Sequence, residues 1–233
     1  MSIRTLQDIL TLEQDPLPID SLDSTYALIA RGAAINPQAP ALSFITRVEE
    51  HTTPACWSHA ELLAEVTRAA NLFRRLGIQR NGAQSGVVAS ILPNLPETHF
   101  TIWGAETAGI LFAVNPQLDA VQMGQLLRAA KAQWIVTSGP EADPENWRRV
   151  STAITDMPNI QGVLAVNPLR HLAGYDKPQV LPATLGGVTV LDFHTELARE
   201  YAKHLDFAPP TAEDFASYFC TGGTTGLPKI ACH

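Results

Sequence analysis

Short apolar runs alternate along this chain with longer stretches in which apolar residues recur at helical spacing. Four runs are predominantly apolar and bounded by turn residues, which is the pattern of strands buried on both faces of a sheet. They lie at residues 86–92, 110–114, 134–137 and 162–166, and a further strand is predicted at 188–191. Because strands that alternate with helices of ten or more residues form βαβ units, the pattern predicts an α/β fold with a largely parallel sheet flanked by helices.

The clearest helix is predicted at residues 58–77. Ser58 and Glu61 have the spacing of a capping box, in which each side chain binds a backbone N–H of the other residue. Apolar residues follow at helical spacing, and Gly77 is a natural C-terminal stop. Further helices are predicted at 24–35, at 96–108 with Asn94 as cap, at 119–131 and 143–156 with Asp119 and Asp143 as caps, and at 192–204 with Asp192 as cap.

Three segments fall outside this regular alternation. Residues 1–24 carry acidic residues and two prolines without a clean period, so we expect an N-terminal surface arm there rather than core. Residues 41–45 and 52–57 are predicted to pair as a hairpin. Residues 167–186 contain three prolines and are predicted to form a loop.

The charge of the chain argues against a nucleic-acid binder. Sixteen Lys and Arg residues against 23 Asp and Glu residues give a net charge of −7, and the basic residues are scattered rather than clustered. A hydrophobic content of 45% is ordinary for a soluble globular chain, and 233 residues suit one or two domains.

The cysteines indicate a reducing compartment. Cys56, Cys220 and Cys232 form an odd set without CxxC spacing, which favours free thiols in a cytoplasmic protein over a disulfide framework. Cys232 and His233 are adjacent, but two ligands make no closed zinc site, so no metal site is predicted. The N-terminus lacks the apolar run of a signal peptide, and no apolar stretch approaches the ~20 residues of a transmembrane segment.

The remaining histidines, carboxylates and tryptophans suggest structural roles. His194 and Glu196 lie at a predicted helix start, where an exposed structural role is favoured over general-base catalysis. Trp103, Trp134 and Trp147 fall on helix or strand faces and are predicted to be core residues rather than stacking platforms. No catalytic constellation is recognised among these residues.

The chemistry of the chain is concentrated in a Thr/Gly-rich segment near its end. An apolar strand at 218–220 runs into six Thr and Gly residues, and these are followed by Leu227, Pro228 and Lys229. Glycine lets backbone N–H groups converge on an anion, while threonine hydroxyls and a lysine suit phosphate oxygens. The predicted phosphate-binding residues are Thr221, Gly222, Gly223, Thr224, Thr225, Gly226 and Lys229.

Two other interpretations of this segment are a P-loop and an ordinary loop. A P-loop has the spacing G-x-x-x-x-G-K-[ST], but here Leu227 and Pro228 separate the last glycine from Lys229, and no Ser or Thr follows. The helix that follows a P-loop is also replaced by a predicted strand at 230–232. An ordinary loop also contains Gly and Thr, although the run of six before Pro-Lys favours phosphate binding.

The segment resembles the phosphate loop of the adenylate-forming enzymes, which include acyl-CoA synthetases, luciferases and peptide-synthetase adenylation domains. Their pattern is roughly T-S-G-T-T-G-x-P-K, and this chain departs at Gly222, where the family usually has Ser or Thr. Ile230, where glycine is common, is a second departure. Residues 57–62, 93–97 and 106–116 also resemble family segments, so that the resemblance extends over about 25–233.

The resemblance implies an acyl-CoA synthetase, which uses ATP and Mg²⁺ to convert a carboxylic acid to an acyl-adenylate and then transfers the acyl group to CoA. It implies that residues 25–233 are the first part of the large N-terminal adenylation domain and end just after the phosphate loop. The catalytic residues are then expected downstream of His233, in a missing C-terminal part of the same enzyme, and the chain alone is expected to be inactive. The alternatives are another adenylate-forming enzyme, such as an aryl-acid or peptide-synthetase adenylation domain, and a non-catalytic α/β module that binds an anion or a partner.

Overall fold

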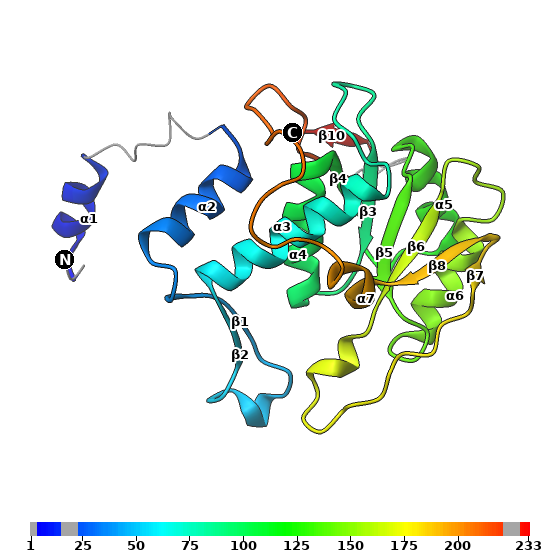
Figure 1. The fold of residues 1–233 in the computed structure, drawn as a ribbon, viewed down its shortest axis with the longest axis horizontal. Coiled ribbons are helices and arrows are strands. Elements are labelled where there is room, and N and C mark those ends of the chain that lie inside the picture. Colours follow the sequence, from blue (N-terminus) through cyan, green and yellow to red (C-terminus); the bar gives the residue numbers. More distant parts are fainter. Residues whose placement is uncertain (1–3, 15–22, 221–228) are drawn as a thin grey trace.

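The protein contains an eight-stranded sheet with the order β10-β9-β4-β3-β5-β6-β8-β7 (Figure 1). The computed structural model describes residues 4–14, 23–220 and 229–233. Six neighbouring strands are parallel, and the two edge strands are antiparallel to their neighbours, which confirms the predicted α/β fold. The parallel strands are β3 (Val87–Ile91), β4 (Ile110–Ala113), β5 (Trp134–Ser138), β6 (Gly162–Val166), β8 (Val188–Asp192) and β9 (Ser217–Cys220). The edge strands are β7 (Thr184–Leu185) and β10 (Ile230–Cys232).

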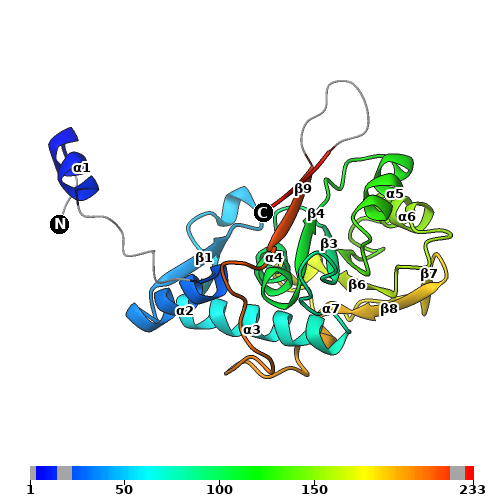
Figure 2. The same ribbon diagram turned by 90° about the horizontal axis from the view of Figure 1, so that it is seen from above.

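Helices cover both faces of the sheet, which explains why its central strands are apolar at successive positions (Figures 1 and 2). Every residue of β3, β5 and β6 is buried. Alternate side chains enter two separate cores, with Val87 and Ala89 in one and Val88 in the other. The helices α5 (Ala120–Ala129) and α6 (Pro144–Ala153) cover the first core, and α3 (His59–Arg75), α4 (Pro96–Ala108) and α7 (Phe193–Leu197) cover the second.

Most of the predicted helix caps are confirmed. The Ser58–Glu61 capping box is present, and Asp119, Asp143 and Asp192 each accept a hydrogen bond from a backbone N–H in the first turn of the following helix.

Two predictions about helix ends are wrong. Asn94 does not cap α4, because the helix begins after Leu95, whose N–H donates to Thr98 Oγ1 at 3.2 Å. The helix predicted at 192–204 ends at Leu197 instead. Beyond it, the side chain of Asn71 binds the backbone at Tyr201, His204 and Asp206, and these bonds hold the segment in a non-helical course.

The segments before α3 lie at one side of the sheet. They comprise α1 (Leu6–Glu13), α2 (Thr25–Ile35), and the antiparallel pair β1 (Pro40–Phe44) and β2 (Ala55–Ser58), which agrees with the predicted hairpin. The predicted surface arm contains the helix α1, which is largely exposed and stands apart from the body in both views. The predicted loop at 167–186 contains the 3₁₀ helix η2 (Pro168–His171) and the short edge strand β7.

Candidate functional site

The predicted phosphate loop is carried by the hairpin of β9 and β10. β9 pairs in parallel with β4, and β10 returns antiparallel, so that Cys220 and Ile230 face each other at the two ends of the loop. Lys229 is exposed and directly precedes β10. The other predicted phosphate-binding residues, Thr221, Gly222, Gly223, Thr224, Thr225 and Gly226, lie outside the described residues.

The hairpin brings this loop to the edge where the parallel strands end. The carboxyl ends of parallel strands line the ligand sites of open α/β sheets, especially where successive connections leave toward opposite sides. Here the connection from β3 runs through α4 to β4, which lies next to β3 in one direction along the sheet. The connection from β5 runs through α6 to β6, which lies in the opposite direction. The switch, the point at which the connections change direction, is therefore between β3 and β5. Lys229 therefore stands at the edge of the sheet expected to bind ligands, two strands from the switch.

Polar side chains join strand ends and connections along this edge of the sheet. Thr137 Oγ1 donates to the Ile91 carbonyl oxygen at 3.2 Å, and Asn146 Nδ2 donates to Thr137 Oγ1 at 2.9 Å, which ties β5 to β3 and α6. Arg149 Nη2 donates to the Pro116 carbonyl oxygen at 2.8 Å, just beyond β4. Sequence reasoning missed these residues, because they form no local motif.

A second group of polar residues at this edge consists of Glu97, His171 and His194. Glu97 lies in the first turn of α4, after β3, and its side chain is 2% exposed. His171 Nε2 lies 2.9 and 3.1 Å from the two Glu97 carboxylate oxygens. His194 Nε2 lies 3.3 Å from Glu97 Oε1 but is not aligned for a hydrogen bond. Connections that follow three different strands thus meet at one carboxylate.

This cluster corrects the prediction for His194 and Glu196. Both were expected to be exposed, yet the side chain of His194 is 20% exposed and that of Glu196 is 7% exposed. Glu196 is ion-paired with Arg75 at 2.8 Å and with Arg199 at 2.6 Å. The helix α7 is covered because it packs onto α3, and a local sequence pattern does not reveal that contact. A structural role remains the better description of Glu196.

The protonation states of the cluster follow from burial and its internal contacts. Burial by itself raises the pKa of Glu97, but the hydrogen bond with His171 and the charges of both histidines outweigh it, so that the pKa is lowered. Burial lowers the pKa of His194 to about 4, and the nearby Glu97 opposes this shift only in part. At neutral pH the cluster therefore contains an ionised Glu97 beside a neutral His194.

The cluster is suited to holding the strand connections together rather than to binding a metal ion. Two open pockets of about 330 and 230 Å³ are both lined by His194 and Arg170. Within residues 4–14, 23–220 and 229–233, no group of three or more His, Cys, Asp and Glu residues is placed to hold a metal ion.

The segment that leads into β9 is anchored to the body of the protein by Arg80. The guanidinium group of Arg80 lies 5.5 Å from the centre of the Phe207 ring and 3.5 Å from the Asp214 carboxylate, and it donates to the Thr107 and Ala208 carbonyl oxygens. Arg80 thus contacts both α4 and the linker at residues 207–214. These contacts fix the course of the chain that leads into the β9–β10 hairpin.

The predictions about cysteines and tryptophans agree with the structure. Cys56, Cys220 and Cys232 are free thiols. Trp134 and Trp147 are buried, and Trp103 packs against the core from a half-buried position. None of the helices in the described part of the chain is long and apolar enough to cross a membrane.

Comparison with known protein sequences finds a family match and relatives that are longer than this chain. Residues 29–233 match the family described as AMP-binding enzyme. The marinolic acid–CoA ligase of Pseudoalteromonas sp. is 29% identical over 99% of this chain and 32% of its own length. The crotonobetaine/carnitine–CoA ligase of Escherichia coli is 30% identical over 74% of this chain and 29% of its own length. The chain thus spans about a third of the length of these curated relatives.

Solved structures share the fold. The anthranilate CoA ligase AuaEII, in complex with anthranoyl-AMP, superposes with a TM-score of 0.68 at 17% identity, over 95% of this chain and 36% of that protein. The fatty acyl CoA synthetase of Mycobacterium tuberculosis superposes with a TM-score of 0.61 at 18% identity, over 89% of this chain and 34% of that protein. The family match covers most of the chain, and the sequence relatives and the fold agree with it. The chain belongs to the AMP-binding enzyme family.

Proposed function

We propose that this chain is the part of an ATP-dependent acid–CoA ligase that supplies the phosphate-binding loop. The observation that carries the proposal is the β9–β10 hairpin, which brings Lys229 and the two ends of a Thr/Gly-rich segment to the carboxyl edge of the sheet. A family member with this segment at this edge is suited to hold the triphosphate of ATP. Residues 25–233 then form the first part of the adenylation domain, and residues 1–24 form an arm in front of it.

The proposed reaction has two steps. A carboxylate oxygen of the substrate attacks the α-phosphorus of ATP, the bond to the bridging oxygen breaks, and pyrophosphate leaves. The CoA thiol sulfur then attacks the acyl carbon, and AMP leaves with the bonding electron pair while the thiol proton passes to solvent. The first step develops charge on the phosphates, so catalysis depends on positioning and on charge neutralisation.

In this scheme the loop binds the phosphates through hydroxyl groups, backbone amides and one cation. The hydroxyls of Thr221, Thr224 and Thr225 and the glycine N–H groups donate to phosphate oxygens, and Lys229 neutralises their charge. Mg²⁺ accompanies the nucleotide and neutralises further phosphate charge when bound. We place its protein ligands in a further part of the same enzyme.

The length of the chain fits a part rather than the whole of such a ligase. Its curated relatives are about three times as long. We propose that the remaining catalytic residues and the CoA site belong to a further part of the same enzyme, and that the chain alone does not complete the reaction. The free cysteines favour a cytoplasmic enzyme. The substrate we propose is a carboxylic acid, as in the relatives' names.

The test is carboxylate-dependent exchange of pyrophosphate into ATP by the complete ligase and its Lys229→Ala and Thr224→Ala variants. A hydrogen bond to a charged group contributes about 1.5 to 3 kcal/mol, so we expect each variant to lose about ten- to a hundredfold in exchange rate or ATP affinity.

The matched control for Lys229 is Lys203→Ala, which removes an exposed lysine from the segment before β9 and is expected to change neither quantity. Unchanged thermal unfolding of all variants separates lost phosphate contacts from lost structure. Full exchange activity in both loop variants would contradict the proposal and favour a loop without a role in phosphate binding.

A further inference from the structure

The strand β10 forms one outer edge of the sheet, and among the described residues no further strand pairs with it. Its next residue, His233, exchanges backbone hydrogen bonds of 2.9 and 3.1 Å with Ser217 of β9. Because bonded and non-bonded pairs alternate along an antiparallel ladder, Ala231 also faces β9, whereas the backbone N–H and C=O groups of Ile230 and Cys232 face outward. Four backbone groups are thus directed at the open side of the hairpin.

The hairpin has the composition of internal strands rather than of a protected edge. Soluble proteins usually protect an edge strand with charged side chains, prolines, bulges or a covering segment. β10 is short, but its pairing continues to His233, and Ile230–Cys232 contains neither a charged residue nor a proline. Cys232 is exposed, and Phe219 of β9 is 42% exposed. Apolar residues at successive positions are typical of strands that are covered on both faces.

A pocket of about 480 Å³ adjoins this edge on the face of the sheet that α5 covers. The hairpin contributes Tyr218, Ile230 and Cys232 to its lining, and the end of α5 contributes Ala129. When an extended segment joins a sheet edge, main-chain hydrogen bonds provide affinity, and pockets for alternate side chains provide specificity. The outward backbone groups and the adjoining pocket therefore supply both parts of a strand-binding surface.

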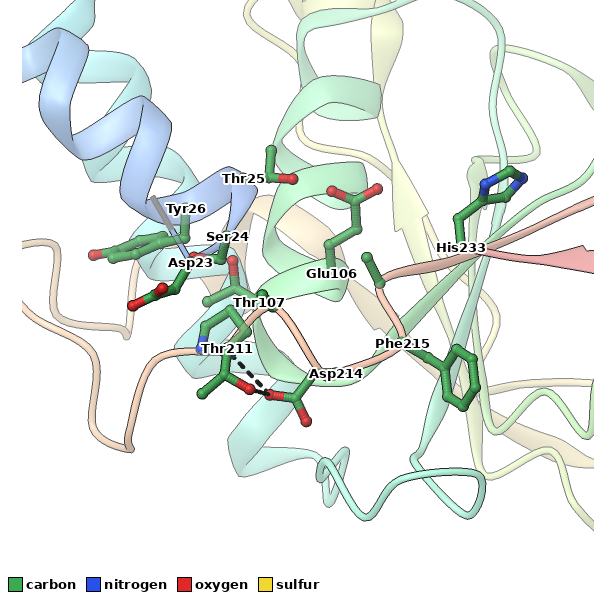
Figure 3. A pocket seen from close by; sticks show the side chains of 13 residues that line it. Asp23, Ser24, Thr25, Tyr26, Glu106, Thr107, Thr211, Asp214, Phe215 and His233 are labelled. Atoms are coloured by element: carbon green, nitrogen blue, oxygen red, sulfur yellow. Dashed lines mark hydrogen bonds between the residues drawn. The ribbon is translucent and has the colours of Figure 1, made fainter. Parts of the chain in front are cut away.

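The opposite face of the hairpin base has a different environment. Figure 3 shows a pocket of about 230 Å³ there, lined by residues of α2, α4 and the linker that precedes β9. His233 belongs to its lining, but Ile230–Cys232 does not. The surface suited to an added strand is therefore the outer edge of β10 together with the pocket on the α5 face.

We propose that this surface binds a β-strand from the further part of the same enzyme, which pairs with β10 and places an apolar side chain in the pocket. The existence of that further part rests on the proposed function and agrees with curated relatives that are about three times as long. In the proposed ligase it follows His233, which is next to β10. A strand tethered so close has a much higher effective concentration at this edge than a second copy of the chain.

Thiol labelling compares the 233-residue chain with the complete ligase. Iodoacetamide modifies accessible cysteines, and peptide mass spectrometry assigns the rate to each residue. We expect Cys232 to react about tenfold or more slowly in the complete ligase, because a covered thiol reacts only when the surface opens locally. The control is Cys56, an exposed thiol on β2, which is expected to react at similar rates in both proteins. Equal labelling of Cys232 in the two proteins would overturn the proposal.

A proline substitution distinguishes strand pairing from mere covering. Cys232→Pro removes an outward N–H, whereas the matched control Cys232→Ser keeps it. In the 233-residue chain this N–H faces solvent, so the two variants are expected to unfold at similar urea concentrations. In the complete ligase the proline variant is expected to unfold at a lower urea concentration than the serine variant. Equal midpoints there would exclude a strand that pairs with β10, and the labelling experiment stands if the proline variant fails to fold.

Two outcomes separate this proposal from its alternatives. Sedimentation velocity of the 233-residue chain should show a monomer, and a dimer that Cys232→Pro dissociates would assign the edge to a second copy instead. Protection of Cys232 in a complete ligase whose Lys229→Ala variant keeps full exchange activity would support the docking surface and contradict the proposed function. Unprotected Cys232, with exchange activity lost in Lys229→Ala, would support the proposed function and overturn the docking surface.

Discussion

Single polar side chains, placed inside the protein, hold the carboxyl edge of this sheet together. Glu97 contacts His171 and His194, which belong to two other strand connections. Thr137 and Asn146 link the ends of β3 and β5 to α6. Buried polar groups stabilise a fold when their partners are present and destabilise it when a partner is lost. The geometry of this edge should therefore respond to pH as well as to mutation.

We expect the chain to lose stability as pH falls from about 6.5 to 4, because of His194. Folding lowers the pKa of this histidine from 6.5 to about 4, so in that range the unfolded chain binds a proton that the folded chain does not. The loss is on the order of 3 kcal/mol. The lowered pKa of Glu97 acts in the same direction at more acid pH.

Urea unfolding at pH 7 and pH 4.5 measures this dependence. His194→Gln should reduce the difference in unfolding free energy between the two pH values, whereas His51→Gln, at an exposed histidine, should leave it unchanged. An equal pH difference in the native chain and in His194→Gln would refute the assignment.

The contrast between the predicted phosphate loop and this cluster shows what can be read from the sequence at the scale of residues. The loop is recognisable because its threonines, glycines and lysine are adjacent in the chain. Glu97, His171 and His194 are far apart in the sequence, and they meet only because the parallel sheet brings the ends of β3, β6 and β8 to one edge. A local sequence pattern therefore cannot predict this contact.

At the scale of elements, α3 and α4 make a very close contact. A Cβ atom added at Gly104 on α4 would lie 2.5 Å from Ala69 Cβ and 3.0 Å from the backbone of α3. Gly104 is thus needed for the distance between these helices, although glycine is a poor helix former.

Gly104→Ala is therefore expected to destabilise the protein. The higher helix propensity of alanine contributes about 1 kcal/mol in its favour, but overpacking costs about 1 to 3 kcal/mol, so we expect a net loss of up to about 2 kcal/mol. Chemical denaturation measures the loss, and adding Ala69→Gly should recover part of it, as a positive coupling in a double-mutant cycle. A stabilised Gly104→Ala chain would show that the two helices separate at little cost.

The strands and most helices were predictable because each is encoded locally, by an apolar run or by a cap and a helical period. The exceptions have tertiary causes. The end of α7 depends on Asn71, which binds the backbone of residues 201–206 from α3. The start of α4 depends on Thr98 rather than on Asn94, since its hydroxyl oxygen accepts from the Leu95 N–H and its hydroxyl group donates to the Pro93 carbonyl oxygen.

At the scale of the whole molecule, the chain has the proposed phosphate hairpin but only about a third of the length of its relatives. We expect it to bind Mg-ATP with a Kd in the millimolar range or weaker. Four or five phosphate hydrogen bonds contribute roughly 6 to 15 kcal/mol, and association itself costs about 4 to 15 kcal/mol, which leaves little net affinity.

Calorimetric titration compares Mg-ATP with Mg-tripolyphosphate. Similar weak affinities are expected, because only the triphosphate is recognised by the proposed loop. A micromolar Kd for Mg-ATP, with much weaker binding of Mg-tripolyphosphate, would instead place an adenosine site within these 233 residues.

The position of β9 in the sheet also determines when the site is completed during folding. β9 is placed beside β4 by a parallel pairing that joins Leu111 to Ser217, across most of the intervening domain. Contacts between residues so distant in sequence require the closure of a long loop of chain and form slowly. During synthesis the strands β3 to β8 emerge first and can assemble without the hairpin. We therefore expect the β9–β10 hairpin to pair with a sheet that has already formed. The proposed phosphate site would then be the last part of this sheet to fold.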